Sequence, residues 1–174
     1  MLPPFLRGPV PGLPPVVSAW LRGLEEVEET VRRWTADLEE EGFWWRPAPG
    51  LNPIGGILRH IARASRRLLA YGLDRPLPAD LEGLPVGAEE FEPLGQRSAE
   101  VRAEFEQAWA ELRAAYQGLA EADLARLVHV GRRRIAVQAV FVLHHLVEHA
   151  QHHAGQLIVL RKLWEARSGA QQQS

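Results

Sequence analysis

Apolar residues recur along most of the chain at alternating intervals of three and four, the spacing of one face of an α-helix. The first such stretch covers residues 16–42 and repeats through Trp20, Leu24, Val27, Val31, Trp34 and Leu38. Its other positions are rich in Glu and Arg, as expected for a face in contact with water. We therefore predict a long bundle helix over residues 16–42.

Three further helices are expected downstream. Asn52 followed by Pro53 predicts a helix start, because the Asn side chain can cap free amides and a proline at the first helical position lacks an amide that would be unpaired anyway. This second helix ends near Gly72, a third covers residues 98–119, and a proline-free fourth covers residues 135–166. We find no alternating pattern long enough for a strand. Four long helices predict an all-α four-helix bundle, with residues 73–96 as a long crossover between helices 2 and 3.

The two ends of the chain differ from this bundle of residues 16–166. Residues 1–15 contain six prolines and are expected to form an extended arm, and residues 167–174 are expected to be a disordered tail. With 174 residues, 46% hydrophobic and 24% charged, the chain has the size and composition of one soluble globular domain.

Charge and composition narrow the classes of partner. The net charge is −2, and the one basic cluster, "GRRRI" at 131–135, is interpreted as the solvated start of the last helix, so no nucleic-acid partner is expected. No apolar run reaches the roughly 18 residues of a membrane helix, and the first residues lack the apolar core of a signal peptide, which favours a cytoplasmic protein. The chain has no cysteine, which leaves histidine as its soft metal ligand.

Five of the seven histidines lie within residues 144–157, in the predicted last helix. The apolar stripe of this helix is formed by Leu143, Leu146, Ala150, Leu157, Leu160 and Trp164. Because each helical residue advances by about 100°, the core position that this stripe skips is occupied by His153. His149, four residues earlier, lies on the same side of the helix. His145 and His152 lie on a flank, and His144 points nearly opposite.

Two histidines four residues apart present their ring nitrogens to one point, as in helices that supply two ligands to a metal. His60, at the edge of the apolar face of the second helix, lies at the same interior margin, so three imidazoles from two helices can meet. A structural interpretation stays open, in which these histidines are hydrogen-bonded core or surface residues. Gln156 falls on the side of His149 and His153 and is a candidate to orient a ligand or a water. His129 falls in a loop and is assigned no role.

Glycines accompany the candidate histidines in both helices. Gly55 and Gly56 precede His60, and Gly155 follows His153. Each glycine costs up to about 1 kcal/mol of helix stability relative to alanine. Close packing of the helices would explain them, and so would room for an ion and its ligand.

Two segments carry a resemblance to a known family. "EHAQHHAGQL" in the last helix and "NPIGGILRHIA" at the start of the second resemble the DinB/YfiT-like family of four-helix-bundle proteins, which shows a histidine in its second helix and an H-x3-H-x-G-Q type motif in its last. The resemblance extends over about residues 16–166, including the loop "WWRPAPG". It implies a divalent metal, zinc or nickel, held by His60, His149 and His153, and frequently a homodimer. The adjacent histidine pairs leave His145 and His152 as less favoured alternative ligands.

The resemblance and the histidines together predict a metal-dependent thiol S-transferase or hydrolase acting on a small molecule. Relatives of this family include thiol transferases that use bacillithiol or mycothiol, and a chain without cysteine would need such a low-molecular-weight thiol as a cosubstrate. The alternative is a non-catalytic bundle that binds a metal or small ligand. A di-iron carboxylate site can be set aside and a zincin-type protease is not favoured, because the chain has neither a Glu-x-x-His pair nor a His-Glu-x-x-His motif.

The last helix also carries apolar residues away from its main stripe, so more than one neighbour must cover it. These residues are Val137, Val140, Phe141, Val147, Ile158 and Val159. Either the N-terminal arm or a second subunit would supply that cover, and we predict a homodimer.

Overall fold

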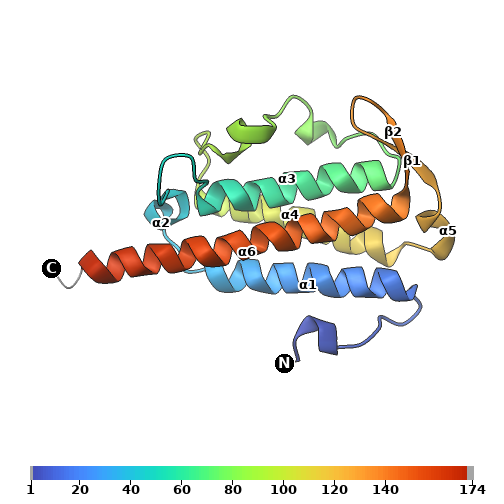
Figure 1. Cartoon of the computed structure of the whole chain (residues 1–174), viewed down its shortest axis with the longest axis horizontal. Helices are drawn as coiled ribbons and strands as arrows, with labels where there is room; N and C mark the ends of the chain where they lie inside the picture. Colours follow the sequence, from blue (N-terminus) through green and yellow to red (C-terminus); the bar gives the residue numbers. More distant parts are fainter. Residues whose placement is uncertain (1, 172–174) are drawn as a thin grey trace.

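The computed structural model describes residues 2–171 and is an all-α four-helix bundle (Figure 1). Its long helices are α1 (Pro15–Thr35), α3 (Ile54–Gly72), α4 (Ser98–Gln117) and α6 (Ala139–Gln171). The shorter elements are η1 (Pro4–Leu6), α2 (Glu40–Trp44), η2 (Ala79–Leu81), η3 (Gly87–Phe91), α5 (Glu121–Leu124), β1 (Leu127–Val130) and β2 (Ile135–Gln138).

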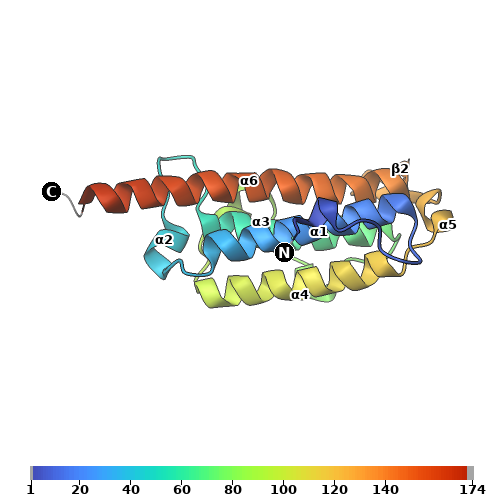
Figure 2. The same cartoon turned by 90° about the horizontal axis from the view of Figure 1, so that it is seen from below.

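The four long helices do not follow one another around the bundle. Helices α6 and α4 lie on opposite sides, with α1 and α3 between them (Figure 2), and both α1 and α3 contact both α4 and α6. The first two long helices of the chain, α1 and α3, therefore lie diagonally opposite each other in the bundle. Helices α3 and α4 run in the same direction, antiparallel to α1 and α6 (Figure 1).

The parallel direction of α3 and α4 explains the long crossover. After Gly72 the chain must return along the whole length of α3 before α4 can begin at Ser98. Residues 73–97 do so along the outer side of α3, with η2 and η3 on the way (Figure 1). The predicted crossover between the second and third long helices is thus confirmed, and it places η3 against α3.

The predicted apolar seams form the core. In α1, Trp20, Leu24, Val27 and Val31 are all at most 5% exposed. Buried polar groups on the aromatic side chains are paired: Trp109 donates a hydrogen bond to the carbonyl of Leu24 at 2.9 Å. None of the helices in residues 2–171 is long and apolar enough to cross a membrane.

The first helix is shorter than predicted. It ends at Thr35 instead of residue 42, and a separate short helix, α2, begins at Glu40. The hydroxyl of Thr35 donates to the carbonyl of Val31 at 2.8 Å, a bond to residue i−4 that slightly destabilises the end of a helix. Leu38 remains buried although it lies outside the helix.

The predicted cap of the second helix is wrong. Helical geometry begins at Ile54, so that Pro53 takes the N-cap position and no side chain caps the helix. Asn52 lies one residue too early for its side chain to reach the free amides of the first turn.

A β-hairpin takes the place of the predicted start of the last helix. Strands β1 and β2 pair antiparallel, with Val130 opposite Ile135, and α6 starts at Ala139. The arginine cluster forms the turn of this hairpin, where Gly131 and Arg134 have positive φ angles of 67° and 47°. The interpretation of this cluster as a helix start is therefore wrong, and His129 lies in a strand rather than a loop.

The ends of the chain pack as follows. The N-terminal arm lies on α1, where Arg7 forms ion pairs with Glu25 and Glu29. Of the apolar residues that the sequence places away from the main stripe of the last helix, Val147 is buried, whereas Phe141 and Val159 are 61% and 58% exposed. Helix α6 includes residues 167–171 of the predicted tail, and residues 172–174 lie outside the described part of the chain.

Candidate metal centre

Three histidines from two neighbouring helices meet inside the bundle. His60 lies in the second turn of α3, and His149 and His153 lie one turn apart on α6. Each offers a ring nitrogen, and these three atoms lie within 4.8 Å of one another. The Nε2 atoms of His60 and His149 are 3.2 Å apart. We call these residues the histidine triad; the helix periodicity and the resemblance both selected them.

The other histidines of α6 do not join the triad. His145 is 60% exposed, and its Nδ1 lies 3.9 Å from the carboxylate of Glu148. His144 accepts a hydrogen bond from the indole of Trp20 at 3.1 Å. His152 is exposed and contacts Gln156. The alternative ligands His145 and His152 therefore face solvent on the flank of the helix.

Two triad rings have acceptors on their outer nitrogens. Nδ1 of His60 lies 2.8 Å from a carboxylate oxygen of Glu90, a fully buried side chain in η3. Nδ1 of His153 lies 3.0 Å from the amide oxygen of Gln156. Both contacts leave the Nε2 lone pair of the ring free for a cation.

Burial favours the neutral, metal-binding form of His149 and His153, whereas hydrogen bonds keep Glu90 ionised. Burial, and to a lesser degree the charges of the neighbouring histidines, lower the pKa of His149 to about 4. Burial also lowers the pKa of His153, partly offset by the hydrogen bond to Gln156. Burial alone would raise the pKa of Glu90, but hydrogen bonds from His60 and Arg67 outweigh it and lower that pKa. At neutral pH, His149 and His153 are therefore neutral and Glu90 is a carboxylate.

The residues present fit a divalent cation. Nδ1 of His149 is buried and has no hydrogen-bond partner, so the polar contact of this ring is made through its Nε2. Its Nε2 lies 3.2 Å from that of His60, close to the ~3.3 Å that separates two nitrogens bound to one tetrahedral zinc ion. Without a metal, one of these two nitrogens carries a proton and donates a hydrogen bond to the other, and a cation between them would be bound by the lone pairs of both. Imidazole nitrogen is a preferred ligand of zinc, nickel, copper and iron alike.

Arginines of α3 bind the crossover segment beside the triad through hydrogen bonds and an ion pair. Arg59 is fully buried and donates hydrogen bonds to the carbonyls of Glu90, Glu92 and Pro93. Arg67 forms an ion pair of 2.7 Å with Glu90. Charge-assisted bonds to several backbone carbonyls fix the path of η3 over the start of α3.

The glycines near the histidines differ in what surrounds them. A Cβ on Gly56 would lie 2.4 Å from the carbonyl oxygen of Phe91, and one on Gly55 would lie 2.5 Å from the ring of Phe43. A Cβ on Gly155 would meet nothing within 4 Å. Close packing explains the first two glycines, because Gly56 packs against the crossover and Gly55 against α2. Neither packs against another long helix at these closest contacts. At Gly155 the space is open.

A pocket of about 430 Å³ lies near the triad, at the end of the bundle where α3 begins, although no triad histidine lines it. Ile57, one turn before His60, and Gln156, one turn after His153, both line it. The complete lining is Gly50, Leu51, Asn52, Ile57, His152, Gly155, Gln156, Val159, Leu160 and Leu163. This mostly apolar concavity has the size of a small-molecule site.

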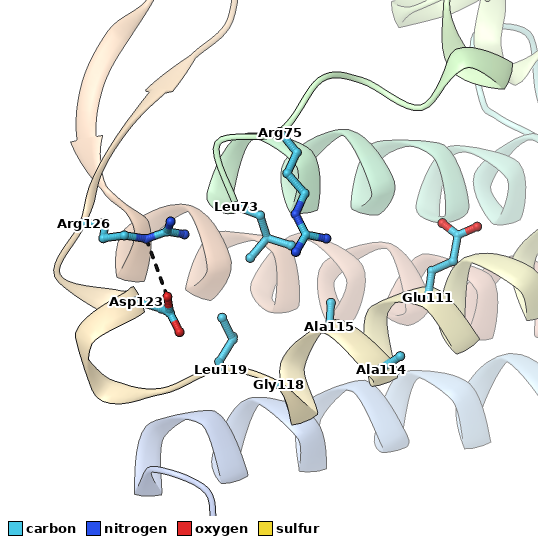
Figure 3. Close-up of a pocket in the computed structure, with 9 residues that line it drawn as sticks. All are labelled: Leu73, Arg75, Glu111, Ala114, Ala115, Gly118, Leu119, Asp123 and Arg126. Atoms are coloured by element: carbon cyan, nitrogen blue, oxygen red, sulfur yellow. Dashed lines mark ion pairs between the residues drawn. The ribbon is translucent and has the colours of Figure 1, made fainter.

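A larger pocket of about 660 Å³ lies far from the histidine triad. It is formed where α3 has ended and α4 is ending, and Arg75, Glu111 and the ion pair of Asp123 with Arg126 line it (Figure 3). The triad lies near the other end of α3. Proximity to the imidazoles, and not size, therefore identifies the pocket relevant to the metal centre.

Sequence reasoning missed Glu90 and the buried arginines of α3. Arg59, Arg63 and Arg66 recur at intervals of four and three, and all three are at most 6% exposed. That spacing is a detectable signal for a helix face that is buried against carboxylates and carbonyls. Glu90 itself carries no local signal, because it belongs to an irregular crossover.

Comparison with known proteins agrees with this architecture. The profile of the DinB superfamily matches residues 23–157, and no curated protein sequence matches the chain. A conserved protein from Enterococcus faecalis has a similar structure, with a TM-score of 0.69, 16% identity, and coverage of 87% of this chain and 98% of that one.

Two further solved structures share the fold. A DinB-like protein from Bacillus cereus has a TM-score of 0.62 and 19% identity, over 82% of this chain and 89% of that one. YfiT from Bacillus subtilis, described as a probable metal-dependent hydrolase with an unusual four-helix bundle topology, has a TM-score of 0.62 and 14% identity, over 89% and 91%. At these identities the structures show a common fold, and the profile match over most of the chain shows that it belongs to the DinB superfamily.

Proposed function

We propose that this protein is a divalent-metal-dependent enzyme in which His60, His149 and His153 are the metal ligands. The observation that carries the proposal is the convergence of three ring nitrogens within 4.8 Å beside a pocket of about 430 Å³. Three protein ligands leave coordination positions open, which is typical of catalytic sites and not of structural ones. Zinc or nickel is the expected metal.

When bound, such an ion lowers the pKa of a bound water to about 7 or binds a thiol as its thiolate. The chain's own residues supply the rest of the site. His149 and His153, neutral at pH 7, present lone pairs, and Gln156 orients the ring of His153. The pocket holds an organic substrate near the triad. The apolar side chains of Ile57, Leu160 and their neighbours shield this substrate from water.

Two reactions fit this arrangement. A hydrolase would use water as its nucleophile, and the description of YfiT as a probable metal-dependent hydrolase supports this branch. A thiol S-transferase would use a low-molecular-weight thiol, which must come from solution because the chain contains no cysteine. Both branches need the same three ligands.

The first experiment measures the metal. Protein purified without an affinity tag is analysed for metal content and titrated with Zn²⁺ and Ni²⁺. We expect about one ion per chain in the wild type, little in His149→Ala and His153→Ala, and wild-type content in the matched controls His145→Ala and His152→Ala. Equal metal content in all five proteins would refute the ligand assignment.

The second experiment tests turnover. Metal-loaded protein is assayed with ester and amide substrates alone, and with electrophiles in the presence of bacillithiol or mycothiol. Turnover that is lost in His149→Ala supports an enzyme, and the thiol requirement separates the two branches. A metal-loaded protein inactive in both screens would favour the alternative, a non-catalytic metal- or ligand-binding bundle.

A further inference from the structure

Glu90 faces the metal centre from a segment that contributes no ligand. Its carboxylate is fully buried, and its two oxygens have different partners: Oε2 lies 2.8 Å from Nδ1 of His60, and Oε1 lies 2.7 Å from Arg67. A carboxylate has no proton to donate. The hydrogen between Glu90 and His60 therefore belongs to Nδ1 of the imidazole.

This contact determines which nitrogen of His60 can bind a cation. A neutral imidazole carries one proton, and if Nδ1 holds it then Nε2 is the lone pair. That Nε2 is the atom 3.2 Å from His149, on the side of the triad. The ring of Phe91, 4.8 Å from that of His60 between centroids, packs against the imidazole as well.

The position of Glu90 is built into the packing of the crossover. The backbone of Phe91 can lie on α3 only because residue 56 has no side chain. Arg59 then binds the carbonyls of Glu90 and Glu92, and Arg67 binds the carboxylate itself. These contacts hold the acid from both its backbone and its side chain.

We propose that Glu90 is a positioning residue that fixes His60 as the Nδ1–H tautomer and directs its Nε2 lone pair to the metal. The inference rests on the proposed metal site and adds to it a residue outside the ligand-bearing helices. Acceptors of this kind orient a ligand ring and raise its basicity, and their loss typically costs about ten- to a hundred-fold in metal affinity. Gln156 makes the equivalent contact to His153 with a neutral oxygen.

Glu90→Gln makes a sharp test, because its amide has only one oxygen. Because Arg67 is a cation and can only donate hydrogen bonds, it binds that oxygen, and the amide NH₂ then points toward His60. Nδ1 must then accept and Nε2 must carry the proton, so the tautomer inverts and the metal-binding lone pair is lost. Glu28→Gln is the matched control: Glu28 is also buried and paired with arginines, Arg32 and Arg113, but lies on α1 away from the triad.

The first readout is the tautomer of His60 in metal-free protein, measured by ¹⁵N–¹H long-range correlation spectra of histidine-labelled samples at pH 7.5. We expect Nδ1–H in the wild type and in Glu28→Gln, and Nε2–H in Glu90→Gln. The second readout is Zn²⁺ affinity by competition with a chromophoric chelator, expected to fall about ten- to a hundred-fold in Glu90→Gln alone.

A wild-type His60 protonated on Nε2 would overturn the inference, and this measurement requires no variant to fold. A Glu90→Gln protein with wild-type tautomer, or with Zn²⁺ affinity within twofold of the wild type, would overturn it as well. If the wild type bound no metal, the proposed function would fail by itself, while the tautomer spectra would still decide whether Glu90 orients the ring.

Discussion

The contact between Gly56 and the crossover can be tested by adding a single methyl group. An alanine at an ordinary helical position replaces glycine with a gain of about 0.5–1 kcal/mol, because the unfolded chain loses less freedom on folding. Position 56 is not ordinary, since the new Cβ would lie 2.4 Å from the carbonyl oxygen and 2.8 Å from the Cα of Phe91. Both are backbone atoms and cannot move away by rotating a side chain.

The magnitude follows from the required shift. To restore an ordinary van der Waals separation, the crossover must move away from α3 by about 1 Å. Overpacking of this kind costs about 1–3 kcal/mol. Set against the helix propensity gained, Gly56→Ala is expected to lower the free energy of unfolding by up to about 2 kcal/mol.

Gly155→Ala is the matched comparison, because it adds the same methyl group to a helix where nothing lies within 4 Å. We expect it to raise the free energy of unfolding by about 0.5–1 kcal/mol, so that the two variants differ by about 1–3 kcal/mol. Guanidinium denaturation with linear extrapolation measures both. Zn²⁺ affinity should fall only in Gly56→Ala, since that variant moves Glu90 away from His60. Equal stabilisation by both substitutions would refute the reasoning.

Three further predictions follow from other parts of the molecule. The pKa of His149 is lowered to about 4, so as pH falls below about 6.5 the unfolded chain takes up a proton at this residue before the folded chain does. Metal-free protein should therefore lose stability between pH 6.5 and 4, which denaturant midpoints at pH 7.5 and 5.0 measure. A His149→Asn variant with an undiminished pH dependence would contradict this prediction. Tyr116→Phe removes the buried hydrogen bond of 2.7 Å to the carbonyl of Leu143 and should cost about 1 kcal/mol in denaturant unfolding without changing Zn²⁺ affinity; no loss of stability would show that this bond contributes nothing. The uncovered apolar side of α6, where Phe141 is 61% exposed, predicts a homodimer by light scattering at micromolar concentration, and a mass of 19.5 kDa would rule it out.

The features that sequence predicted correctly depend on helical periodicity. The seam of α1 and the relative directions of His149 and His153 follow from angles within one helix, which the chain itself determines. The hairpin was not predictable in this way, since strands of four residues are too short to show alternation. Its turn also requires positive φ angles at Gly131 and Arg134, and a cluster of arginines gives no signal for such a turn. Glu90 was missed for a different reason: its contact with His60 joins residues 30 positions apart through an irregular segment, whose path depends on Gly56 and Arg59.

The placement of two triad histidines on α6 has a consequence for biosynthesis. A protein is synthesised from its N-terminus, and a contact between two distant segments cannot form until the second segment has been made. His60 is synthesised early, 89 residues before its partner His149. The helix that carries His149 and His153 is also the one that closes the bundle against both α1 and α3. A nascent chain that extends no further than α3 therefore carries His60 without its two partners, and the triad can form only when α6 packs against α1 and α3.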